Sequence, residues 1–142
     1  SQSFKITDKV LRSIEANGSG VFVVNLPAAD LVAETGMLER TVEAVQYVDT
    51  CLGGIVEKVR EAGGIALITS SHGNCEEMQN AETGEPYYQT TQNPVPFHFV
   101  SNSANGMKLR ENGVLADIAP TILGILDIKI PAEMTGSDLR QS

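Results

Sequence analysis

Two groups of residues in this chain have side chains that could hold a divalent metal ion. The first is Asp30-x-x-x-Glu34, and the second is the run Ser71-His72-Gly73-Asn74. Carboxylate oxygen and imidazole nitrogen suit zinc, manganese or iron, so Asp30, Glu34 and His72 could converge on one ion. The alternative is that the carboxylates are solvated in a loop and that His72 bonds to the backbone in a turn. Spacing alone favours this alternative.

Other residues with reactive side chains make weaker candidates. A nucleophile at Ser70 or Ser71 would need a nearby base, but adjacent side chains at a strand end diverge, and the chain has no G-x-S-x-G motif. Cys75 precedes two glutamates whose charge disfavours its thiolate, and His98 lies within an apolar run. The sequence also lacks a phosphate-binding glycine loop and a dinucleotide fingerprint. Motifs therefore predict no catalytic and no cofactor-binding residue.

The elements that must position these residues are helices and short apolar strands. Apolar residues that recur every three or four positions predict helices at 6–16, 37–62 and 115–126. The first helix is expected to end at Asn17-Gly18. Strands are predicted from three apolar runs, at 20–26, 65–69 and 94–100. The segment 27–36, which carries Asp30 and Glu34, is predicted to be a loop.

Helices between strands predict a sheet that is mostly parallel and flanked by helices, because parallel strands need crossover connections. The chemistry of such sheets collects at the carboxyl ends of the strands. Three segments are expected there: 25–36, 70–74 and 101–105. The predicted fold class is therefore α/β, with a single domain over residues 1–142.

Composition and charge exclude several classes of partner. Ten basic and eighteen acidic residues give a net charge of −8, which repels nucleic acid and anionic membrane surfaces. No apolar run is long enough for a membrane helix, and the N-terminal residues lack the apolar stretch of a signal peptide. Cys51 and Cys75 have no CxxC spacing, which is typical of reduced intracellular thiols. The predicted location is the cytoplasm, without nucleic-acid or membrane partners.

Several stretches of the chain resemble cofactor-independent (2,3-bisphosphoglycerate-independent) phosphoglycerate mutases, a family of the alkaline-phosphatase-like superfamily. The resemblance runs from Phe4 to Gly136. Its most specific parts are 25–36, 68–74 with Glu76 and Met78, 93–97, and 115–123. The resemblance implies a partial alkaline-phosphatase-like domain, namely the C-terminal part of the phosphatase-like domain of the mutases.

The resemblance also implies which residues would bind metal. Active family members use two manganese ions, held in this region by an Asp with a His four residues later, by an Asp-His pair, and by a further His. Here the first two positions hold Asp30 and Glu34, and the pair is Ser71-His72. The last position holds Thr90. Asp30 and His72 therefore match, each at a different ion, and Glu34 is a possible substitute. The ligands at Ser71 and Thr90 are lost.

These substitutions decide which function is predicted. The family interconverts 2- and 3-phosphoglycerate in glycolysis through a phosphoserine, and the resemblance implies that this serine and the remaining ligands lie upstream of the present residues. We therefore expect an inactive homologue that binds no metal tightly and acts as a binding or assembly scaffold. The alternative is a subunit or fragment that retains metal-dependent phosphoglycerate mutase or phosphoesterase activity. A partial domain exposes sheet edges, so we expect a homo-oligomer or another protein chain as partner.

Overall fold

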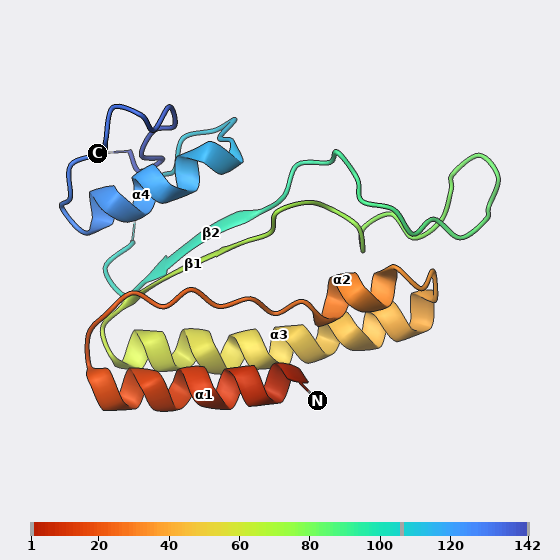
Figure 1. The fold of residues 1–142 in the computed structure, drawn as a ribbon, viewed down its shortest axis with the longest axis horizontal. Coiled ribbons are helices and arrows are strands. Elements are labelled where there is room, and N and C mark those ends of the chain that lie inside the picture. The colour runs from red at the N-terminus through yellow and green to blue at the C-terminus, as the bar shows by residue number, and fades with distance from the viewer. Residues whose placement is uncertain (1, 106, 142) are drawn as a thin grey trace. The chain divides into compact units, whose positions relative to one another are not determined.

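The computed structural model describes residues 2–105 and 107–141, which divide after Asn102 into two compact units (Figure 1). The described part of the first unit contains helices α1, α2 and α3 and the strands β1 and β2. The second unit contains the short 3-10 helix η1 and helix α4. The prediction of one domain over residues 1–142 stays a prediction, because compact units of one chain can fold either together or apart.

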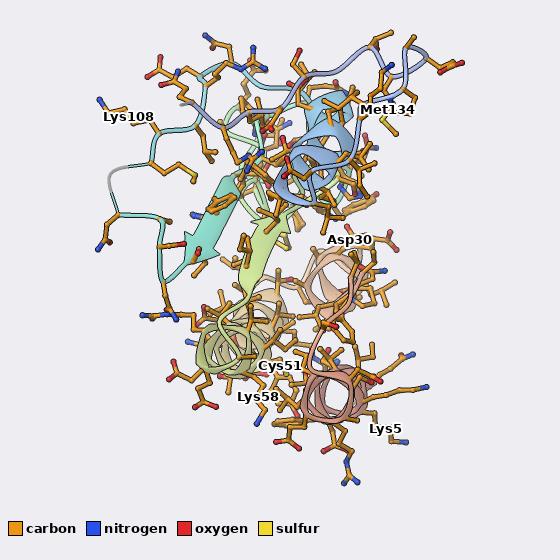
Figure 2. The ribbon with its side chains drawn as sticks, turned by 90° about the vertical axis from the view of Figure 1, so that its left-hand side faces the viewer. Lys5, Asp30, Cys51, Lys58, Lys108 and Met134 are labelled. Carbon is orange, nitrogen blue, oxygen red and sulfur yellow. The ribbon has the colours of Figure 1, made fainter. Side chains whose placement is uncertain are left out.

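Two long helices form the base of the first unit. Helix α1 spans Gln2–Asn17 and helix α3 spans Leu38–Glu61, and the two lie side by side (Figure 1). Both predicted helices are confirmed, although α1 begins four residues earlier than expected. It ends as predicted, because Gly18 adopts a φ of +61°, which costs glycine little. Figure 2 looks along the helices and places the buried Cys51 between them.

The strand predicted at residues 20–26 is not formed among the described residues. The segment is extended, but it makes no backbone hydrogen bond with any other described residue. Val21 and Val23 are 61% and 93% exposed, although a continuous apolar run is typical of a strand that is buried on both faces. An apolar sequence favours an extended backbone, but a strand exists only where a neighbouring strand completes its hydrogen bonds.

The segment predicted as a loop at 27–36 contains a helix instead. Helix α2 spans Ala28–Ala33, places Asp30 in its first turn, and is capped at its C-terminus by Glu34. Alanine and leucine favour helix, and a negative charge in the first turn interacts favourably with the helix dipole. Ala33 is fully buried where α2 packs on α3. The loop prediction failed because helix propensity and packing outweigh the proline and glycine that bracket the segment.

The described residues form a two-stranded sheet that is antiparallel, so the predicted mostly parallel arrangement is not confirmed. Strand β1 spans Ile65–Thr69, strand β2 spans Phe97–Ser101, and the two pair with Thr69 opposite Phe97. The connection between them contains no helix that could carry the chain back across the sheet. It runs out and returns as two arms that pair at Gly73–Thr91 and at Gln79–Pro86 (Figure 1). Such a connection favours antiparallel strands, as in a long hairpin.

Antiparallel pairing changes which segments share an edge of the sheet. The loop after β1 lies beside the residues that precede β2, because Thr69 pairs with Phe97. The segment 101–105 follows the opposite end of the pair, where Ile65 pairs with Ser101. The expectation that 70–74 and 101–105 gather at one edge is therefore wrong. Residues 90–96, and not 101–105, lie at the same end of the strand pair as residues 70–74.

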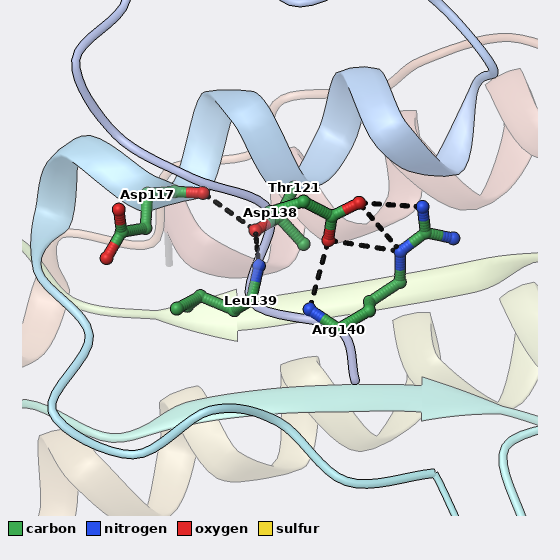
Figure 3. Close-up of polar contacts among 5 residues, drawn as sticks. All are labelled: Asp117, Thr121, Asp138, Leu139 and Arg140. Atoms are coloured by element: carbon green, nitrogen blue, oxygen red, sulfur yellow. Dashed lines mark hydrogen bonds and ion pairs between the residues drawn. The ribbon is translucent and has the colours of Figure 1, made fainter. Parts of the chain in front are cut away.

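The second unit is built around helix α4, Ile118–Ile125, which follows η1, Leu115–Asp117. The helix predicted at 115–126 is thereby confirmed. Thr121 is fully buried; its hydroxyl donates to the Asp117 carbonyl at 2.7 Å and accepts from the Leu139 amide at 3.0 Å (Figure 3). These bonds fasten the C-terminal segment to α4. No helix in the described ranges is long and apolar enough to cross a membrane.

Candidate functional site

Asp30 and two residues of the loop after β1 form a polar cluster in the first unit. The amide Nδ2 of Asn74 donates to Asp30 Oδ1 at 2.7 Å. His72 Nε2 lies 4.0 Å from Asp30 Oδ2, which is too far for a hydrogen bond. Asn74 is only 4% exposed, whereas the side chains of Asp30 and His72 are more than a third exposed. The structure thus brings together Asp30 and His72, the two residues that the resemblance implies as metal ligands, and adds a buried amide.

The orientation of the His72 ring follows from a bond to the backbone. Nδ1 lies 3.1 Å from the Gly73 carbonyl oxygen and donates to it, so in the neutral ring Nε2 carries the lone pair. Nε2 is the ring nitrogen that lies 4.0 Å from Asp30 Oδ2. The alternative interpretation from the sequence, a turn histidine bonded to backbone, is confirmed for Nδ1.

The other candidate positions do not join this cluster. Glu34, Ser71 and Thr90 are exposed, and their side chains make no hydrogen bond with any residue that the structure describes. Glu34 sits at the C-terminus of α2, one helical turn beyond Asp30. Its role as a possible substitute for the histidine that the resemblance implies at this position stays a prediction.

A second polar group, which sequence analysis missed, is centred on Glu76. Its carboxylate accepts from the Asn74 backbone amide at 2.6 Å, from Asn93 Nδ2 at 3.0 Å and from the Thr91 hydroxyl. The Thr91 hydroxyl bond is the main reason that the pKa of Glu76 lies below its usual value. Thr91 and Asn93 are brought here by the returning arm of the connection. Only the antiparallel pairing places them beside Glu76, so no sequence signal could have found them.

The pKa of Glu76 leads to a pH-dependent prediction. Because the folded-state pKa is lowered, this group stabilises the fold at pH values above its unfolded pKa, and the contribution is lost as the pH falls through the folded pKa. We expect Glu76→Gln to lower the free energy of unfolding by at most about 1 kcal/mol near neutral pH, since the side chain is exposed. The difference from wild type should vanish in acid.

Urea titrations across the acid range measure this difference. Glu82→Gln is the matched control, because the Glu82 side chain is exposed and makes no hydrogen bond within the described residues. A pH-independent difference for Glu76→Gln would contradict the assigned role of its carboxylate.

Cys75 lies between the two polar groups. Burial raises the pKa of its thiol, and the nearby carboxylates of Asp30 and Glu76 raise it further. The sequence predicted an unreactive thiol because of like charge, and the structure agrees in direction but makes burial the larger cause. Both cysteines of the chain are free.

The donor set at this site does not fit a two-metal centre. Within residues 2–105 and 107–141, His, Cys, Asp and Glu form no group of three or more that could hold an ion. One oxygen of Asp30 already accepts an amide hydrogen. One carboxylate oxygen and one imidazole nitrogen are too few ligands, since tight sites in proteins have at least three protein ligands. In this structure the cluster is held together by hydrogen bonds.

The sequence of the chain was compared with models of known protein families. A family model described as "Metalloenzyme superfamily" matches residues 1–130. The chain belongs to the metalloenzyme superfamily. Its α/β fold and the resemblance to cofactor-independent phosphoglycerate mutases are confirmed by the relatives and the solved structure that follow.

Two curated relatives illustrate the resemblance. The chain is 42% identical over 137 residues to the 2,3-bisphosphoglycerate-independent phosphoglycerate mutase of Clostridium novyi (strain NT), and the match covers 96% of this chain and 27% of that protein. It is 47% identical to mutase 2 of Methanosarcina barkeri (strain Fusaro / DSM 804), with 96% and 26% covered. The chain thus spans about a quarter of the length of these relatives.

A solved structure has the same fold. Leishmania mexicana phosphoglycerate mutase, crystallised at low cobalt concentration, superimposes with a TM-score of 0.85 at 24% identity. The superposition covers 99% of this chain and 28% of that one. At this identity the likeness shows the fold alone.

Proposed function

We propose that this chain is a phosphoglycerate mutase homologue that has no catalytic activity of its own and serves as a binding or assembly scaffold. The observation that supports this proposal is the extended segment at 20–26. The side chains of Val21, Phe22 and Val23 are exposed, and the backbone groups of the segment have no partner among the described residues. An extended segment of this kind can accept a strand from another polypeptide.

The surface next to this segment supports the same proposal. Residues 21–24 and the face of α1 that carries Ile6 and Val10 line a groove of about 340 Å³. Phe22, at 40% exposed, belongs to this lining. Large exposed apolar patches in proteins generally mark interaction sites. A strand that pairs with 20–26 would satisfy the backbone and cover the groove at once.

The loss of catalysis is the second part of the proposal. The names of the relatives describe phosphoglycerate mutases. Of the metal positions that the resemblance implies in this region, Asp30 and His72 keep the family residue, and Glu34, Ser71 and Thr90 do not. Loss of charged and imidazole ligands removes the means of activating a nucleophile and balancing phosphate charge. We propose the cytoplasm as the location, which the two free thiols support.

Light scattering at micromolar concentration tests the scaffold role. We expect a homo-oligomer, and we expect Val23→Asp to shift it to monomer, because a buried unpaired carboxylate in the paired segment is strongly unfavourable. Val42→Asp is the matched control, since Val42 is also exposed (47%) but lies on α3 outside the groove. A monomeric wild type, with no chain recovered on immobilised protein from native lysate, would contradict the proposal.

A mutase and phosphoesterase assay of the purified chain, with added manganese, tests the loss of catalysis. We expect no turnover above the buffer. Turnover that disappears in Asp30→Ala and His72→Ala would instead support a subunit or fragment with retained metal-dependent activity.

A further inference from the structure

The turn that precedes η1 carries a chemically labile dipeptide, Asn112-Gly113. Asparagine is one of the thermolabile residue types of proteins. Before a glycine, its side-chain amide is open to attack by the next backbone nitrogen. We propose that Asn112 is a modification site, at which the side chain loses ammonia spontaneously, and that the product loosens the second unit. The inference does not rest on the proposed function, which concerns the first unit.

The proposed reaction needs only the chain and water. The backbone nitrogen of Gly113 attacks the side-chain carbonyl carbon of Asn112, a C–N bond forms, and the NH2 group leaves as ammonia with the proton of the backbone amide. Water then opens the five-membered imide at either carbonyl. One opening gives aspartate, and the other gives isoaspartate, in which the backbone runs through the former side chain. Each product adds one negative charge to the net charge of −8.

Asn112 and Gly113 are accessible for this reaction in the folded chain. Both residues are exposed. Neither the Asn112 side chain nor the Gly113 backbone amide makes a hydrogen bond with any residue that the structure describes. Within the described ranges, therefore, no hydrogen bond of these two groups has to break before the nitrogen can reach the side-chain carbonyl.

The local structure favours the two residues that make the dipeptide labile. Asn112 has a φ of +58°, a left-handed conformation that glycine and asparagine adopt more readily than other residues. Gly113 packs closely on the C-terminal segment, since a Cβ there would lie 3.0 Å from Leu139 Cδ2 and 3.2 Å from Leu139 Cδ1. A side chain at position 113 would hinder the attack of the nitrogen, but this packing disfavours one.

A second Asn-Gly pair, Asn17-Gly18 at the end of α1, has the opposite arrangement. The Asn17 side-chain amide donates to the Ser13 carbonyl oxygen at 3.0 Å, and the Gly18 backbone amide donates to the Ile14 carbonyl oxygen at 3.3 Å. Both bonds must open before the Gly18 nitrogen can attack the Asn17 side chain. The end of the helix therefore protects this pair, although its two residues are the same.

Isoaspartate at position 112 would disturb the bonds on both sides of the turn. The Arg110 backbone amide donates to the Leu139 carbonyl oxygen at 2.8 Å, and the Val114 backbone amide donates to Asp117 Oδ2 at 2.8 Å. Isoaspartate lengthens the backbone between these two amides by one methylene group. The two bonds cannot both keep their geometry unless the turn rearranges. We therefore expect the modified second unit to lose protection from hydrogen exchange.

Incubation of the purified chain at neutral pH, followed by peptide mapping with mass spectrometry, tests the reaction. We expect Asn112 to be converted at least about tenfold faster than Asn17, because two hydrogen bonds protect Asn17. In concentrated urea the two should be converted at similar rates, since unfolding removes the protection. Equal rates in the folded chain, an unmodified Asn112, or an equally large difference in urea would each overturn the inference. Asn105-Gly106 extends beyond the described residues and is not compared.

Hydrogen exchange of the incubated chain tests the consequence. We expect peptides from 107–141 to lose protection in proportion to the fraction converted at position 112. Asn112→Gly suits the positive φ and has no side chain to react, so its protection should stay constant during incubation. Asn17→Gln is the matched control, because it removes the protected Asn-Gly pair and should change as wild type does. A converted wild-type chain that keeps its full protection would overturn the proposed loosening.

Discussion

Gly136→Ala is expected to destabilise the second unit by about 1–3 kcal/mol, the usual cost of overpacking. A Cβ at this position would lie 2.0 Å from the carbonyl oxygen of Ala116 and 2.5 Å from its carbonyl carbon. These are backbone atoms, which cannot rotate away as the end of a side chain can. The C-terminal segment must therefore shift away from η1. Hydrogen exchange of peptides from 107–141 should show the loss of protection.

Gly53→Ala is a control that we expect to change stability in the opposite direction. Gly53 is exposed to solvent and lies far from both ends of α3, and a Cβ there would meet no atom within 4 Å. Alanine is favoured over glycine in a helix by roughly 0.5–1 kcal/mol, so this variant should be more stable than wild type. A Gly136→Ala variant with wild-type stability and exchange would contradict the close packing of this segment on η1.

Thr121→Val is expected to destabilise the same unit by about 1–3 kcal/mol. Valine keeps the shape of threonine but removes the hydroxyl that accepts from the Leu139 amide (Figure 3). Leu139 is 5% exposed, so its amide would be left without a partner in a buried place. The cost comes from this unpaired donor rather than from lost volume.

Thr121→Ser separates the contribution of the hydroxyl from that of the methyl group. Serine keeps the hydroxyl and loses one methyl group, which costs roughly 0.8–1 kcal/mol when it is buried. Urea unfolding of both variants, with exchange at Leu139, measures the difference. If the valine variant were the more stable of the two, the hydroxyl would not be the link between α4 and the C-terminal segment.

Of the contacts that Asp30 makes, the sequence could indicate the one with His72 but not the one with Asn74. The types of Asp30 and His72 indicated that the two residues could converge, although spacing alone favoured the alternative. In the structure, His72 Nε2 lies 4.0 Å from Asp30 Oδ2. The contact with Asn74 was not predicted, because asparagine at a turn is common and its side chain can bond many partners. Whether an amide reaches a carboxylate depends on side-chain position, which residue spacing does not define.

Local periodicity by itself determined the long helices. The repeats of apolar residues at three and four positions in α1 and α3, and the glycine after each, depend only on neighbours along the chain. The same holds for β1 and β2 as extended apolar runs.

Tertiary structure alone decided how these elements pair. Residues 20–26 have a strand-like sequence yet form no strand among the described residues, because hydrogen bonds between strands require a partner that local sequence does not specify. The strands β1 and β2 pair in an antiparallel register. Because of this register, the connection between them returns along itself, and Thr91 and Asn93 lie beside Glu76. Hydrogen bonds between residues far apart in the chain depend on the path of the backbone between them, and that path is set by the whole fold.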